Sequence, residues 1–190
     1  MKILITGTSG GIGGALANAA RSAGHEVLEI NRGAFANLAS KALGDQTNLD
    51  AVVFCTGFCP ISSITRMTDI MFEETLHVNC TLFMRLMRHI VANRLYSPGG
   101  MRAIAISSVS AKEGWAGGSA YCASKGALSA LCRALNAELA AKKISVTALE
   151  PERIDTKMYR ECGARLAPPD APPPRSPLSL AHEILDALEA

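Results

Sequence analysis

Tyr121 and Lys125 lie four positions apart in the stretch YCASKGALSAL, among residues that are almost all small or apolar. In a helix, positions i and i+4 share one face, so the phenol and the ammonium are neighbours. A free tyrosine has a pKa of about 10, and a nearby ammonium favours the phenolate and lowers that value. Such a pair can exchange a proton with a substrate hydroxyl or carbonyl group. The spacing alone, however, favours an ordinary helix whose polar face carries both side chains.

A glycine-rich turn, ITGTSGGIGGAL, stands between the first predicted strand and the first predicted helix. Gly7, Gly11 and Gly13 let the backbone turn tightly and approach a pyrophosphate. The N-terminus of the following helix offers free N–H groups and the positive end of its dipole to that anion. Glycines are common in turns, but the strand before this turn and the helix after it favour a dinucleotide site.

The second predicted strand, EVLEI, is followed by Asn31 and Arg32, with no carboxylate at its tip to bind a ribose diol. A guanidinium group there suits a 2′-phosphate. The sequence therefore favours NADP over NAD as a cofactor. A solvated surface arginine is the alternative interpretation.

Asn79 lies in the apolar stripe of a long predicted helix, about Thr68 to Leu95, three residues after Leu76 and four before Phe83. A buried amide at such a position needs hydrogen-bond partners. It is either a satisfied core asparagine or a functional residue. His77 lies off the stripe and is predicted to be a surface histidine.

The composition excludes several classes of protein. The chain has 190 residues, a formal net charge of +2, 48% hydrophobic and 19% charged residues, which predicts one globular domain and no role for nucleic acid as the main partner. Its apolar runs are too short to span a membrane, and no leader precedes the first strand, so we expect a cytoplasmic protein. The six cysteines are interpreted as buried thiols in a reducing compartment. Cys55 and Cys59 have no second pair at ligand spacing, so no metal site is predicted.

Short β-rich segments alternate with helical patterns along the chain, which predicts parallel βαβ units and a doubly wound sheet. The predicted strands are KILITG, EVLEI, DAVVFCTG, RAIAISS and ISVTAL. Helices are predicted in the segments between them, including FANLASKAL and about Tyr121 to Lys142, and SLAHEILDALEA closes the chain as a helix.

Five motifs together resemble the short-chain dehydrogenase/reductase family. They are TGTSGGIG, HVN, ISS, YCASK and PERIDT, and they extend from Thr6 to Thr156. The resemblance implies an NADP(H)-dependent oxidoreductase that interconverts a carbonyl and a secondary alcohol of a small-molecule substrate. It also implies a homodimer, because the helices that begin near Thr68 and Tyr121 resemble the surfaces by which family members dimerise.

The resemblance implies four catalytic residues. Tyr121 would be the general acid/base, and Lys125 would hold the nicotinamide ribose and tune the phenol. Ser108, thirteen positions before Tyr121, would bind the reacting oxygen. Asn79 would hold a water molecule that links Lys125 to solvent. A plain turn at the end of a strand is the alternative interpretation for Ser107 and Ser108.

The implied cofactor contacts come from the glycine turn, from residues that follow strands, and from the catalytic helix. They are Gly7, Ser9, Gly11, Ile12, Gly13, Asn31, Arg32, Thr56, Gly57, Tyr121, Lys125, Pro151, Ile154 and Thr156.

Several positions depart from the family pattern. FCTG stands where Asn-Asn-Ala-Gly is usual, and Pro151-Glu152 stands where Pro-Gly is usual. About twenty residues separate Arg32 from Val52, so a strand and a helix that are usual in the family are missing, and no strand follows the last helix. We therefore expect a shortened member of the family.

The expected fold is α/β, with a Rossmann-like doubly wound parallel sheet reduced to about five strands in the order 2-1-3-4-5 and helices on both faces. One NAD(P)-binding domain would cover residues 1–190, with a substrate loop at about 157–177. The alternative function is a catalytically weak or inactive sensor or scaffold that binds a nicotinamide dinucleotide. The missing elements and Glu152 favour that alternative, and the intact Ser-Tyr-Lys-Asn set argues against it.

Overall fold

The computed structural model describes residues 1–31, 43, 47–163 and 170–190. Within these residues the chain forms a five-stranded sheet in the order β2-β1-β3-β4-β5, and every pairing is parallel. The strands are β1 (Lys2–Thr6), β2 (Glu26–Ile30), β3 (Ala51–Phe54), β4 (Met101–Ile106) and β5 (Ile144–Leu149). The predicted fold class and strand order are confirmed.

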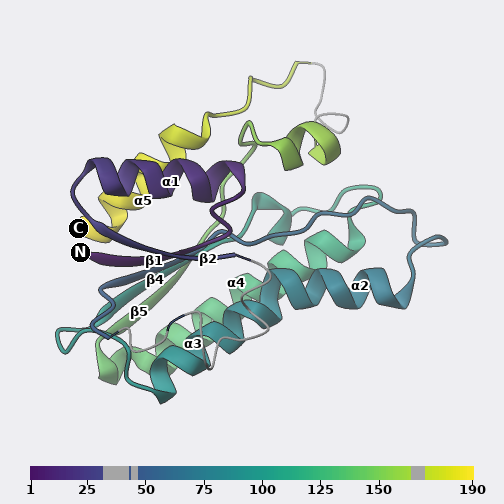
Figure 1. The fold of residues 1–190 in the computed structure, drawn as a ribbon. Coiled ribbons are helices and arrows are strands. Elements are labelled where there is room, and N and C mark those ends of the chain that lie inside the picture. Colours follow the sequence, from purple (N-terminus) through teal and green to yellow (C-terminus); the bar gives the residue numbers. More distant parts are fainter. Residues whose placement is uncertain (32–42, 44–46, 164–169) are drawn as a thin grey trace.

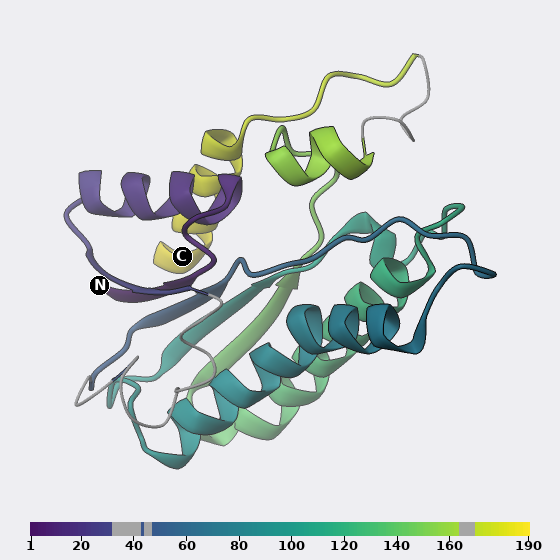
Figure 2. The ribbon, with the colours of Figure 1, turned by 45° about the vertical axis from the view of Figure 1, so that its right-hand side comes forward.

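Helices cover both faces of the sheet (Figure 1). One face carries α1 (Gly11–Ser22) and α5 (Pro177–Glu189), which lie against each other. The other face carries α2 (Asp69–Leu76), α3 (Leu82–Ala92) and α4 (Ser119–Leu139). Figure 2 shows these two helical layers with the edges of the strands between them.

The burial of each strand follows from its place in the sheet. In β1 the side chains of Ile3, Leu4 and Ile5 are fully buried, because a central parallel strand is covered by helices on both faces. In β5, an edge strand, buried and exposed residues alternate at first, and β2 at the other edge exposes Glu26. Polar residues at sheet edges oppose pairing with another chain.

The sheet separates two hydrophobic cores. Under α3 and α4, the rings of Phe54 and Phe83 lie 5.3 Å apart between centroids, within a cluster that includes Leu86 and Leu128. Under α1 and α5, Ile5 packs with residues of both helices. The two layers hold the strands so that all their carboxyl ends meet at one edge of the sheet, where crevices for ligands form in such folds.

The helices differ from the sequence prediction in three details. The predicted helix from Thr68 to Leu95 contains a π-helical turn, η3 (His77–Thr81), between α2 and α3. A second π-helical turn, η6 (Tyr159–Gly163), lies within the expected substrate loop. Short 3-10 turns, η4 (Val109–Ala111) and η5 (Ala140–Lys142), precede and follow α4. Arg32 and nearly all of the predicted helix FANLASKAL lie outside the described residues.

Candidate active site

The glycine turn after β1 is folded by close backbone contacts that exclude side chains. Gly7 has a φ of +70°, and its N–H donates to the Ile30 oxygen at 3.0 Å. A Cβ at Gly13 would lie 2.5 Å from the Gly7 oxygen, and a Cβ at Gly7 would lie 3.0 Å from the Thr56 nitrogen. The turn therefore lies directly against the residues that follow β3.

No side chain caps the N-terminus of α1 among the described residues. Its N-cap is Gly10, which has no side chain, and the first turn contains no acidic residue. The free N–H groups and the helix dipole therefore face the turn without a competing side chain. A Cβ at Gly11 would lie 2.8 Å from Thr156 Cγ2, which brings the PERIDT segment alongside. These features fit a pyrophosphate. Ser9 is exposed here, and Ile12 packs into the core beneath α1.

A carboxylate that the sequence analysis did not single out reaches this turn from β2. Glu29 accepts hydrogen bonds from Thr8 and from Arg21, and these two partners hold the pKa of its carboxyl below the usual value. Thr8 Oγ1 also lies 3.3 Å from Asn31 Oδ1. The alternation along β2 places Glu29 on the same face as α1, which was the signal available in the sequence.

Thr56 and Gly57 connect the glycine turn to the catalytic candidates. The buried Thr6 Oγ1 accepts hydrogen bonds from the Thr56 N–H at 3.3 Å and from the Thr56 hydroxyl at 2.9 Å. A Cβ at Gly57 would lie 3.7 Å from Asn79 Oδ1 and 3.8 Å from Lys125 Nζ. The side chains of Asn79 and Lys125 therefore both approach the loop after β3 at Gly57.

Asn79 is fully buried in η3, and its amide joins three segments of the chain. Its Oδ1 accepts the Phe58 N–H at 2.7 Å, and its Nδ2 donates to the Phe58 oxygen at 2.8 Å and to Ser124 Oγ at 2.8 Å. Ser124 Oγ in turn donates to the Tyr121 oxygen at 2.7 Å. π-Helical turns occur frequently at functional sites, and this one directs the amide between the β3 loop and α4.

Lys125 is buried in α4, with 4% of its surface exposed. Its Nζ donates to the Ile106 oxygen at 2.8 Å and lies 5.6 Å from the centroid of the Tyr121 ring. Burial lowers the pKa of this ammonium to about 8, although the nearby Cys59 thiol works against that shift. The two side chains expected to act together are therefore neighbours.

The prediction that the Lys125 ammonium lowers the pKa of Tyr121 is wrong for the protein without a bound cofactor. Burial of the phenol raises its pKa above the usual value, the Cys59 thiol adds to the rise, and a hydrogen bond with Ser108 only partly opposes it. The Lys125 ammonium is bound to the Ile106 carbonyl, so it lies over the ring rather than against the hydroxyl. The phenol is thus held protonated.

Ser108 and Ser107 face different environments after β4. Ser108 accepts the Ser110 N–H at 3.1 Å and is the serine that reaches the Tyr121 hydroxyl. Ser107 is buried and donates to the Lys125 oxygen at 3.1 Å, so it positions α4 instead. Both form a turn at the end of a strand, and only Ser108 also faces the phenol.

The PERIDT segment follows β5 along the same edge. The Pro151 oxygen accepts the Val109 N–H at 3.2 Å, and Ile154 is buried in the core beneath α1 and α5. Thr156 Oγ1 accepts the Tyr159 N–H at 3.1 Å and so begins the segment that contains η6. Glu152, the departure from the family pattern, is exposed.

The indole ring of Trp115 lies beside the Tyr121 phenol. The Trp115 and Tyr121 rings lie 6.3 Å apart between centroids, and Trp115 Nε1 donates to Ser110 Oγ at 3.2 Å. A Cβ at Gly118 would lie 2.4 Å from the indole, so the ring sits on the backbone that starts α4.

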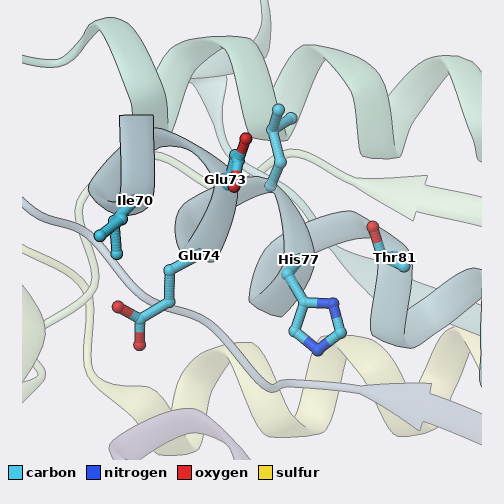
Figure 3. Close-up of a pocket in the computed structure, with 6 residues that line it drawn as sticks. Ile70, Glu73, Glu74, His77 and Thr81 are labelled. Carbon is cyan, nitrogen blue, oxygen red and sulfur yellow. The ribbon is translucent and has the colours of Figure 1, made fainter. Parts of the chain in front are cut away.

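A separate surface groove lies along α2 and η3, lined by Ile70, Glu73, Glu74, Leu76, His77 and Thr81 (Figure 3). His77 lies in this groove and is exposed, as predicted for a surface histidine. Within the described ranges no group of three or more His, Cys, Asp or Glu residues is placed to bind a metal ion. No helix in the same part of the chain is long and apolar enough to cross a bilayer.

Comparisons with known proteins agree with this architecture. The chain is 30% identical over 183 residues to nodulation protein G of Rhizobium sp. (strain N33), a match that covers 83% of this chain and 74% of that protein. It is 31% identical over 181 residues to the 3-oxoacyl-(acyl-carrier-protein) reductase FabG of Rickettsia felis, covering 82% of this chain and 73% of that protein.

Solved structures show the same fold. A short-chain type dehydrogenase/reductase from Mycobacterium ulcerans matches with a TM-score of 0.83 and 22% identity, over 98% of this chain and 82% of that one. A dehydrogenase/reductase from Sinorhizobium meliloti 1021 matches with a TM-score of 0.77 and 23% identity, over 98% of this chain and 87% of that one. A family model described as short chain dehydrogenase matches residues 30–166. The chain therefore belongs to the short-chain dehydrogenase family.

Proposed function

We propose that this protein is an NADP(H)-dependent oxidoreductase that interconverts a carbonyl and a secondary alcohol, with Tyr121 as the general acid/base. The observation that carries the proposal is the convergence of the Asn79 amide and the Lys125 ammonium on Gly57, one turn of α4 from the phenol. This cluster lies at the same sheet edge as a helix N-terminus that fits a pyrophosphate.

When bound, the nicotinamide cofactor would supply or accept the hydride. Gly7, Gly11, Gly13 and the N-terminus of α1 would hold its pyrophosphate, with Ser9 and Ile12 in the same turn. Asn31 and Arg32 would meet the adenosine ribose, and the remaining contacts would come from Thr56, Gly57, Tyr121, Lys125, Pro151, Ile154 and Thr156.

The protonation of Tyr121 supports reduction of a carbonyl at neutral pH. A phenol held protonated by burial is ready to donate its proton to a developing alkoxide. Ser108, which already hydrogen-bonds the phenol, would bind the same substrate oxygen. Lys125, with a pKa of about 8, carries its positive charge at neutral pH and would stabilise the phenolate that remains.

Asn79 would act mainly by positioning. Both amide protons and one Oδ1 lone pair are used in hydrogen bonds to Phe58 and Ser124. A second lone pair on Oδ1 is left to accept a water molecule beside Gly57. That water would connect Lys125 to solvent and restore the proton that leaves Tyr121.

A sensor or scaffold without turnover is the second candidate. The hydrogen bond that directs Lys125 to the Ile106 carbonyl favours it, because that bond holds the ammonium over the Tyr121 ring rather than against its hydroxyl. Both candidates share the cofactor site, a single domain over residues 1–190 and a substrate loop at about 157–177, and they differ in whether a hydride and a proton are transferred to or from a substrate.

Replacing Tyr121 by phenylalanine separates the two candidates. The variant Tyr121→Phe keeps the ring and loses the proton donor, so turnover should fall about 100- to 10,000-fold while NADPH binding is retained. Loss of NADPH absorbance across a panel of ketones, aldehydes and quinones measures turnover, and fluorescence titration measures binding. Tyr96→Phe, at a tyrosine outside the site, is the matched control. Wild-type protein that binds NADPH and never consumes it would support the sensor.

The buried ammonium of Lys125 predicts a pH dependence of stability. Its folded pKa, about 8, lies below the ordinary value of 10.5, so the unfolded chain binds more protons between these values and stability rises with pH there. Buried thiols with raised pKa values act in the opposite direction above about pH 9. The comparison with Lys125→Met isolates the lysine.

From pH 7 to pH 9 the unfolding free energy of the wild type should therefore rise by about 1 kcal/mol relative to Lys125→Met. Urea titrations at the two pH values measure the difference. A constant difference would mean that the ammonium is not desolvated.

Arg32 tests the choice of cofactor. If its guanidinium binds a 2′-phosphate, Arg32→Ala should weaken NADPH binding about tenfold more than NADH binding. Titration of both cofactors measures this ratio, and Arg133→Ala, at an exposed arginine of α4, is the control. Equal effects on NADPH and NADH would refute the role of Arg32 and favour NAD, which the Glu29 carboxylate near the turn would also suit.

We propose a homodimer formed through the surfaces of α2, α3 and α4. On α2, Ile70 is 76% exposed, an apolar side chain that a partner would cover. Light scattering should give twice the chain mass of 20.0 kDa, and Ile70→Asp should shift the protein towards monomer. Leu178→Asp, at a leucine of α5 that is 51% exposed, is the control. A wild-type monomer at micromolar concentration would contradict the proposal.

A further inference from the structure

Two cysteines from distant parts of the chain meet at the candidate active site. Cys59 lies in the loop after β3, and Cys162 lies in η6. The Cys162 Sγ donates to the Cys59 backbone oxygen at 3.0 Å, although 103 positions separate the residues. The Cys162 thiol also adds to the rise in the pKa of Cys59. Both cysteines are free and half-buried. The Cys162 thiol therefore contacts the backbone of Cys59.

The pair borders the phenol of Tyr121. Gly57 stands two positions before Cys59, and a Cβ there would lie 3.8 Å from Lys125 Nζ, which is 5.6 Å from the centroid of the Tyr121 ring. Cys59 and Cys162 both raise the pKa of the Tyr121 hydroxyl. The same two segments also approach each other at a second point, because a Cβ at Gly57 would lie 3.6 Å from Met158 Cε. A covalent bond between the cysteines would join two walls of the site.

We propose that Cys59 and Cys162 are an oxidation-sensitive thiol pair whose disulfide ties η6 to the loop after β3 beside the Tyr121 hydroxyl. This disulfide prevents η6 from moving away from the phenol, and it therefore restricts the entry of substrate. The effect on turnover rests on the proposed function, whereas formation of the disulfide does not.

The oxidant is a low-molecular-weight disulfide, RSSR. The Cys162 thiolate attacks one sulfur of RSSR, the RS–SR bond breaks, a mixed disulfide forms and one RS⁻ leaves. Cys59 then loses its proton and attacks the Cys162 sulfur, which forms the Cys59–Cys162 bond and releases the second RS⁻. Two protein thiols are oxidised, and RSSR is reduced to two RSH once the protons are taken up.

The sequence of the two attacks follows from the environments of the thiols. Burial raises the pKa of Cys59 to about 12, so at neutral pH it is a thiol and a poor nucleophile. Attack by Cys59 is therefore the slower, closing step, and it should accelerate as the pH rises.

Oxidised glutathione is the probe. The protein is incubated with it, the remaining thiols are blocked, and intact mass and peptide mapping identify the products. We expect the loss of two hydrogens per chain and a linked peptide that contains Cys59 and Cys162. Turnover of NADPH should be lost in step with that peptide and recovered on addition of dithiothreitol.

Two variants locate the bond. Cys162→Ser should yield no linked peptide and should keep its turnover in oxidised glutathione. Cys122→Ala is the matched control, because Cys122 also borders the Tyr121 phenol, and it should still form the Cys59–Cys162 link. A glutathione adduct that persists on Cys162, or a disulfide between other cysteines, would contradict the proposal that Cys59 and Cys162 form a disulfide.

The activity measurements separate this inference from the proposed function. A linked peptide with unchanged turnover would overturn the restriction of substrate entry. A reduced protein that never consumes NADPH would contradict the proposed function, and the linked peptide would still establish the thiol pair.

Discussion

The buried amide of Asn79 is the interaction on which the candidate active site depends. It binds both backbone polar groups of Phe58 and the hydroxyl of Ser124, which bonds the backbone of Tyr121. One side chain thereby connects η3, the loop after β3 and the first turns of α4. Breaking such a bond in the interior costs about 1–3 kcal/mol for each polar group left unpaired. The position of Gly57 relative to Lys125 follows from these bonds.

The sheet, and the edge at which several candidate site residues meet, could be predicted from local patterns together with the family resemblance. Apolar runs at strand length, separated by helical periodicity, predicted parallel βαβ units and a doubly wound sheet, and the family resemblance implied five strands in the order that the structure shows. The parallel arrangement then brings the carboxyl ends of the strands to one edge. The glycine turn, Gly57 and Thr156 therefore meet although the sequence separates them widely. The roles of individual residues at this edge remain proposals.

Features that depend on tertiary packing could not be predicted. The π-helical turn at Asn79 changes the hydrogen-bond register within a helix, and the spacing of apolar residues carries no sign of it. The direction of the Tyr121 pKa depends on how fully the phenol is desolvated and on where the Lys125 ammonium finds a partner. The pairing of Cys59 with Cys162 joins segments that no periodicity relates. Glu29 is different, because the alternation along β2 already placed it on the α1 side.

A crystal structure of the protein with bound NADPH tests the central claim most directly. We expect the pyrophosphate at the N-terminus of α1 and the nicotinamide ribose within hydrogen-bond reach of Tyr121 and Lys125, with the phenol facing the space beside the nicotinamide. A cofactor bound elsewhere, or a Tyr121 hydroxyl turned away from the nicotinamide ring, would contradict the proposal that this residue transfers the proton.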